Sequence, residues 1–131
     1  MVGKKRINEI MEKFKDKKVL GAYGNAMFFG QESRGITQIR GNGVLVLTET
    51  ELYFEMWFPK RILQIPFNSI QRIETPKSHL GKTRNKKLLK VVFINESGEI
   101  DSVAWFIRKR VEEWVVALEK IIQNINRYLK E

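Results

Sequence analysis

The chain has 131 residues, no cysteine and a formal net charge of +9 at pH 7, and this length fits one domain with a core of its own. The lack of cysteine excludes disulfides, thiolate metal sites and a cysteine nucleophile. The basic surplus favours anionic partners such as lipid headgroups, nucleic acid or an acidic protein, although many basic domains are only solvated. Because no signal-peptide pattern or membrane-spanning stretch is evident, we expect a cytoplasmic protein, with peripheral attachment to the inner membrane surface as one option.

Residues 1–18 are expected to form a short basic amphipathic helix outside the main domain. Its apolar residues recur at helical spacing, and they are Ile7, Ile10, Met11 and Phe14. Such a stripe either enters a lipid interface or docks on the protein itself. Since the stripe is narrow, docking on the protein is the expectation.

Residues 19–131 are expected to form one domain that begins with a series of short strands. After a first strand over residues 19–31 and a polar connection over residues 32–42, a hairpin over residues 43–58 gives the clearest signal. Its second half alternates in period two, with Leu52, Phe54, Met56 and Phe58 on one face and Tyr53, Glu55 and Trp57 on the other. Later strands are expected at residues 62–67, 70–75, 88–94 and 99–107.

From residue 108 to residue 130 the apolar period becomes three and four, which predicts one long amphipathic helix. Trp114 lies one turn into this helix and is expected to enter the core. The apolar stripe then continues past the length that a small barrel needs, through Ile121, Ile125, Tyr128 and Leu129. We expect this surplus to pack on the apolar stripe of the N-terminal helix, or on a second copy of the chain in a homo-oligomer.

About seven short strands followed by a helix predict a mainly β (α+β) fold, an antiparallel meander rolled into a barrel that the long helix closes. Expected core positions are Val46, Leu52, Phe54, Ile65, Ile73, Val91, Phe93, Trp114 and Leu118.

The chain contains the segments GNGVLVLTETELYF, ILQIPFNSIQRIE, KKLLKVVFINESGE and VAWFIRKRVEEWVVAL. Together they resemble the pleckstrin-homology (PH) superfold, and within it the GRAM and bacterial PH-like families, over about residues 19–118. The resemblance implies a PH-like barrel of about seven antiparallel strands with a closing C-terminal helix, and a binding module for lipid or protein.

No catalytic, metal or cofactor site is predicted. His79 is the single histidine and lies in a basic loop without a nearby acid, so we expect it to be solvated. Glu96, Glu99 and Asp101 cluster at one turn, but their spacing matches no calcium loop, and we expect a solvated hairpin. With no phosphate-binding loop or nucleophile motif, neither an enzyme nor a small-molecule substrate is expected.

The predicted anion-binding residues lie in the first and third strand connections, and they are Arg34, Arg40, Lys60 and Arg61. In lipid-binding PH domains these two connections hold the headgroup, so the resemblance implies this role here. The chain lacks the family's denser Lys and Arg pattern and carries Glu32 in the first connection. We therefore expect diffuse attraction to an anionic membrane surface, with a protein partner as the alternative.

A second basic group lies in the loop over residues 76–87, with Lys77, Lys82, Arg84, Lys86 and Lys87. Nucleic acid ranks below lipid and protein as its partner, because the loop has no aromatic residues to stack on bases. Tyr53 and Trp57, expected to be exposed, lie on a different hairpin. The sequence leaves open whether this loop lies at the same end as the other cations.

Overall fold

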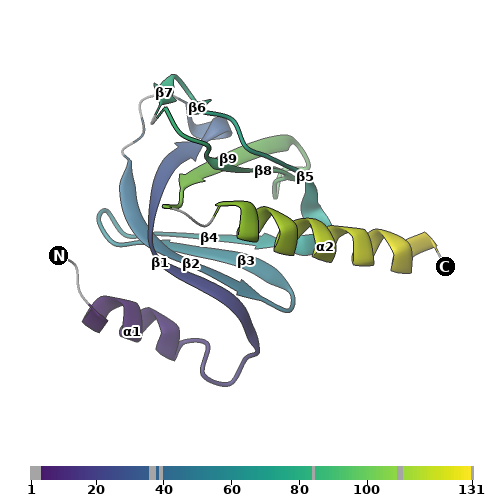
Figure 1. Ribbon diagram of the computed structural model, residues 1–131, viewed down its shortest axis with the longest axis horizontal. Coiled ribbons are helices and arrows are strands. Elements are labelled where there is room, and N and C mark those ends of the chain that lie inside the picture. Colours follow the sequence, from purple (N-terminus) through teal and green to yellow (C-terminus); the bar gives the residue numbers. More distant parts are fainter. Residues whose placement is uncertain (1–3, 36–37, 39, 84, 109–110, 131) are drawn as a thin grey trace.

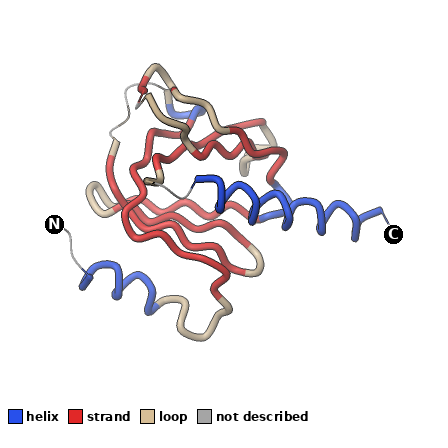
Figure 2. The backbone as a smooth tube through the Cα atoms, in the orientation of Figure 1, coloured by secondary structure: helices blue, strands red, loops and turns tan. Residues whose placement is uncertain are grey.

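The computed structural model describes residues 4–35, 38, 40–83, 85–108 and 111–130, with side chains as far as residue 125. Figure 2 shows a mainly β molecule with a helix at each end of the chain. The elements follow in the order α1 (Lys4–Glu12), β1 (Val19–Gln31), η1 (Glu32–Arg34), β2 (Gly41–Thr48), β3 (Glu51–Met56), β4 (Arg61–Pro66), η2 (Phe67–Ser69), β5 (Ile70–Glu74), β6 (Ser78–His79), β7 (Lys82–Thr83), β8 (Leu89–Ile94), β9 (Ile100–Phe106) and α2 (Val111–Lys130).

Seven antiparallel strands form one sheet in the order β4-β3-β2-β1-β9-β8-β5, which confirms the predicted fold class. The last strand, β9, returns to pair with β1 and so joins the two halves of the sheet. Among the described residues, β4 and β5 are the two edges of this sheet and do not pair with each other. The sheet therefore does not close into the barrel that was predicted. Figure 1 shows α2 running between the two halves, where it contacts β5, η2 and β8.

The main core lies between the inner face of the sheet and α2. Its centre is aromatic, since the Phe54 ring lies 5.2 Å from that of Phe28 and 5.4 Å from that of Trp105, centroid to centroid. Trp114 and Leu118 of α2 are buried against this cluster, as predicted. Of the other predicted core positions, two differ. Ile73 is only half-buried, and Val46 is buried on the opposite face of the sheet.

The α1 helix packs on the outer face of β2 and β3, away from α2 (Figure 1). Ile10 and Phe14 are buried there with Val44, Val46 and Tyr53. The predicted contact between the two helices is therefore wrong. Strands β2 and β3 are apolar on both faces, so their outer face needs a cover of its own.

The apolar stripe of α2 turns instead toward the main core. Ile121, Ile122 and Ile125 are half-buried against it. The side chains of Tyr128 and Leu129, which were predicted to extend this stripe, lie outside the described residues.

The segment between β5 and β8 lies beside the end of β1. Its histidine, His79, is only 5% exposed, and its Nε2 donates to the carbonyl oxygen of Gly30 at 3.0 Å. Gly30 has a φ of +117°, and a Cβ there would lie 3.1 Å from a methyl carbon of Leu80. The prediction of a solvated histidine is wrong, because the partner that buries it is remote in sequence.

Candidate functional site

The first and third strand connections meet at one end of the sheet, as the resemblance implied. A Cβ on Gly41, next to Arg40, would lie 3.0 Å from the carbonyl oxygen of Phe58. Arg61, at the start of β4, bonds to Gln31 and Gln38 from the first connection and its flank. The hairpin of β6 and β7 also reaches this end, where His79 bonds to Gly30. This part of the long loop therefore lies at the same end as the first and third connections.

Arg61 braces this end of the sheet. Its Nη1 donates to Gln38 Oε1 at 3.2 Å, its Nη2 donates to Gln31 Oε1, and its guanidinium carbon lies 5.1 Å from the centre of the Phe28 ring. Burial lowers the pKa of Arg61, the Arg34 charge lowers it further, and Asp101 opposes both. Two of the five N–H donors of Arg61 and one face of its guanidinium are therefore used within the fold.

Asp101 is a buried acceptor for the same connection. It accepts from Gln31 Nε2 at 2.7 Å, from the Ser33 backbone N–H at 2.9 Å and from Ser33 Oγ at 2.7 Å. Burial acts to raise the pKa of Asp101, but these hydrogen bonds lower it below its ordinary value. The prediction that this turn is wholly solvated is wrong for Asp101, which lies in β9 and ties that strand to the first connection.

The other predicted cations are exposed at this end. Arg40 lies with its guanidinium carbon 5.1 Å from the centre of the Phe29 ring, and Arg34 and Lys60 are also exposed. Between β3 and β4, Phe58 is 84% exposed. It was predicted to continue the buried face of the strand, but β3 ends at Met56 and Phe58 stands in the turn.

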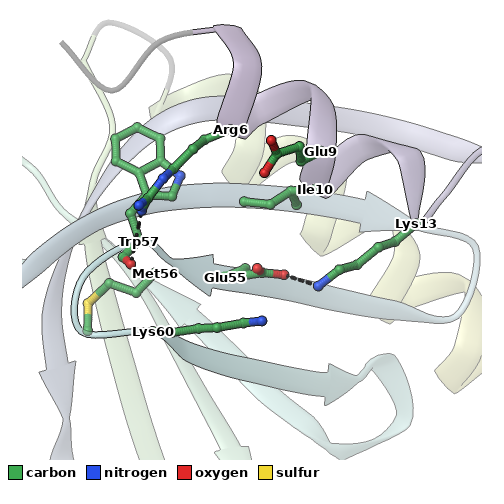
Figure 3. Close-up of a pocket in the computed structure, with 8 residues that line it drawn as sticks. All are labelled: Arg6, Glu9, Ile10, Lys13, Glu55, Met56, Trp57 and Lys60. Carbon is green, nitrogen blue, oxygen red and sulfur yellow. Dashed lines mark hydrogen bonds and ion pairs between the residues drawn. The ribbon is translucent and has the colours of Figure 1, made fainter.

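A groove of about 420 Å³ lies between α1 and the β3–β4 turn (Figure 3). Sequence reasoning missed it because it placed α1 elsewhere. Its lining residues are Arg6, Glu9, Ile10, Lys13, Glu55, Met56, Trp57 and Lys60.

Glu55 pins α1 to the sheet at one part of this groove. It is 7% exposed, and its Oε1 accepts from Lys13 Nζ and from the Tyr53 hydroxyl, each at 2.6 Å. Burial acts to raise the pKa of Glu55, but these two donors and the charges of Lys13 and Lys60 lower it. The pKa of Tyr53 is raised, first by burial and then by its bond to Glu55. Tyr53, expected to be exposed, is thus buried under α1.

The opposite part of the groove is rich in donors. Arg6 Nη1 donates to the carbonyl oxygen of Trp57 at 3.3 Å, and the two side chains lie beside each other in Figure 3. Trp57 Nε1 is shielded from solvent and has no acceptor among the described residues. Lys60 extends along the floor of the groove, and within the same residues its ammonium makes no hydrogen bond or ion pair.

The second basic group does not gather at one place. Lys77, Lys86 and Lys87 are exposed, and Lys87 Nζ lies 3.1 Å from Glu112 Oε1 on α2. Lys82 lies in the hairpin near Gly30, and Arg84 lies outside the described residues. These cations therefore follow the loop from the end of β1 to the start of α2.

Neither a metal centre nor a membrane span is found in the part of the chain that the structure describes. No group of three or more Asp, Glu or His side chains there could hold a metal ion. Within the same residues, no helix has both the length and the apolar character to cross a bilayer.

No family model and no curated protein matches the chain. Several solved structures match it. A chain of the 8S snRNP assembly intermediate is 10% identical with a TM-score of 0.62, over 80% of this chain and 82% of that one. The C-terminal domain of an unknown protein from Leishmania infantum is 14% identical with a TM-score of 0.59, over 89% of this chain and 98% of that one.

The linker-DH/PH domains of p115-RhoGEF are 15% identical with a TM-score of 0.50, over 88% of this chain and 33% of that one. At such identities the likeness concerns the fold alone. The narrower GRAM assignment stays a prediction. Strand order, the helix between the two half-sheets and these neighbours together show that the chain has a PH-like fold.

Proposed function

We propose that this chain is a non-catalytic PH-like binding module that attaches to anionic membrane surfaces at the end where the first and third connections meet. The observation that carries the proposal is Phe58, which is 84% exposed at the β3–β4 turn. Lys60 follows it in the same turn, and the connection that bears Arg34 and Arg40 lies against its backbone. An apolar ring among cations suits the boundary between lipid headgroups and acyl chains.

The α1 helix adds charge to the same surface. Lys4, Lys5 and Arg6 are exposed at its start, and Arg6 bonds to the residue before Phe58. Each well-placed cation near an anionic surface contributes roughly 1 kcal/mol. Since Arg61 is engaged within the fold, we assign the membrane contact mainly to Arg34, Arg40, Lys60 and the start of α1.

A protein-interaction or adaptor module is the second candidate, because exposed apolar side chains also lie elsewhere on the molecule. Leu20 lines a small groove between β1 and α2 and is half exposed, and Val116 of α2 is 59% exposed. A protein partner or a second copy of the chain would cover such residues. Nucleic acid ranks lower, since the cations of the long loop are spread along it.

Co-sedimentation with vesicles tests the proposal. The protein should pellet with vesicles that contain phosphatidylserine at low salt, stay in solution with pure phosphatidylcholine, and be released as salt screens the surface. Phe58→Ser should weaken binding roughly tenfold, because part of the gain from burying a phenylalanine is lost. Val116→Ser, the matched control on α2, should bind as the wild type does. If the wild-type protein does not pellet with anionic vesicles at low salt, the membrane proposal is rejected and the protein partner remains as the candidate.

A further inference from the structure

In the groove between α1 and the β3–β4 turn, the charged and polar side chains are only partly paired with one another. One carboxylate, Glu55, already has two donors, Lys13 and Tyr53. Three other donor groups converge on the groove from different parts of the chain: Arg6 from α1, and Trp57 and Lys60 from the β3–β4 connection.

The indole of Trp57 is the most telling of these groups. Its Nε1–H is closed off from solvent without an acceptor among the described residues, whereas buried N–H groups are almost always paired. Arg6 lies beside the indole and donates one hydrogen bond to the carbonyl oxygen of Trp57. A guanidinium has further donors in a fixed fork, which matches the oxygens of a phosphate.

We propose that this groove binds the phosphate of a phosphate-bearing anion, either a lipid headgroup or a soluble phosphoester. Arg6 would turn onto its oxygens from one side and so uncover the shielded Trp57 N–H, and the flexible, exposed Lys60 would contact them from the floor. A volume of about 420 Å³ holds a phosphate with a glycerol-sized substituent. Glu9 also lines the groove, and its carboxylate opposes an anion there.

Trp57 and Phe58 are neighbours in the chain, so the groove lies beside the turn that we propose to enter the membrane interface. A headgroup phosphate would come within reach of Arg6 and Lys60 while Phe58 meets the acyl boundary. The inference deepens the proposed membrane function. It rests on that function only if the phosphate belongs to a lipid headgroup.

Titration of the ¹⁵N-labelled protein with sn-glycerol 3-phosphate tests the site directly. The indole N–H resonance of Trp57, assigned by its loss in Trp57→Phe, should shift saturably, while those of Trp105 and Trp114 in the main core stay in place. Lys60→Gln and Arg6→Gln should each weaken binding about fivefold. Glu9→Gln should strengthen it, and Lys120→Gln, which removes an exposed charge on α2, should leave it unchanged.

An unmoved Trp57 resonance at millimolar sn-glycerol 3-phosphate would overturn the inference, as would an equal loss in Lys120→Gln and Lys60→Gln. Lys60 lies in a turn, so its variant keeps the test valid even if Arg6→Gln disturbs α1. Phosphatidylserine vesicles separate the two sources. If wild type binds these vesicles but the indole does not respond to the phosphoester, the groove inference fails and the membrane function stands. If the indole resonance shifts with the phosphoester but the protein does not bind the vesicles, the site is confirmed and its ligand is a soluble phosphoester.

Discussion

His79 donates a hydrogen bond from Nε2 to the carbonyl oxygen of Gly30, a residue 49 positions earlier in the chain. The bond holds the hairpin of β6 and β7 against the end of β1, where the first connection begins. Because a carbonyl oxygen only accepts, Nε2 carries a proton, and protonation of the imidazole must occur at Nδ1.

The first prediction concerns pH. Burial lowers the pKa of His79, with Lys90 and Lys82 acting in the same direction and the Gly30 bond and Glu32 against it. In the unfolded chain His79 takes up a proton near a pH of about 6.5, so below that value the unfolded state binds more protons than the folded one. The free energy of unfolding should therefore be fully retained above this pH and fall as the pH drops toward the folded-state pKa.

Urea unfolding at a series of pH values checks this. His79→Gln should flatten the dependence in the window just below a pH of about 6.5, while carboxylates such as Glu55 and Asp101, whose pKa values are lowered, act only at more acidic pH. An unchanged slope in His79→Gln would assign the effect to another group.

The second prediction concerns the anchor of α1. Lys13→Met should lower the free energy of unfolding by about 1 kcal/mol, because it leaves the buried Glu55 with one donor fewer while Lys13 itself is half exposed. Hydrogen exchange should accelerate in α1 before it does in β8 and β9. Lys15→Met is the matched control, because Lys15 and Glu12 form an exposed pair at 3.3 Å. Equal effects of the two variants would show that the Glu55 contact is not what holds the helix.

The third prediction concerns the close approach of β2 to β3. A Cβ on Gly43 would lie 2.2 Å from the carbonyl oxygen of Glu55, a backbone atom that cannot move aside. Gly43→Ala should therefore cost about 3 kcal/mol or more in urea unfolding. On the neighbouring strand, Gly21→Ala places its Cβ 4.0 Å from Leu47 and should change stability little. A Gly43→Ala protein as stable as Gly21→Ala would contradict the register of this hairpin.

The fourth prediction concerns the cover that α1 provides. Deleting the residues before Lys18 should uncover Val44, Val46 and Tyr53 on the outer face of the sheet. A contiguous apolar patch of this kind promotes association, so light scattering should report dimers or aggregates and the melting temperature should fall. A stable monomer after the deletion would show that the outer face tolerates water.

The hairpin shows how far the sequence predicts the fold. Period two correctly grouped Leu52, Phe54 and Met56 on the core face. Alternation does not say what covers the other face, and Tyr53 and Trp57 were wrongly expected to be exposed. The run Val44–Leu45–Val46–Leu47 is apolar on both faces and carried the missing signal, because strands of that kind are buried on two sides.

The site was less predictable than the fold for a different reason. Arg34, Arg40 and Lys60 lie in connecting segments as expected, whereas Arg61 is the first residue of β4, and charge alone does not show which cation is free. Arg61 is held by Gln31 and Gln38, which are 30 and 23 residues away. Asp101 is held by Ser33, 68 residues away. Local sequence patterns carry no information about such pairs.

Because α1 docks on the sheet, the groove is formed by two segments that lie 54 positions apart in the chain, counting from Arg6 to Lys60. An anion that contacts both residues can bind only while the helix is docked. Binding and docking must then favour each other by the same free energy. Near saturation, the melting temperature would consequently rise with the logarithm of ligand concentration, and proteolysis of the N-terminal segment would slow in proportion to the concentration itself.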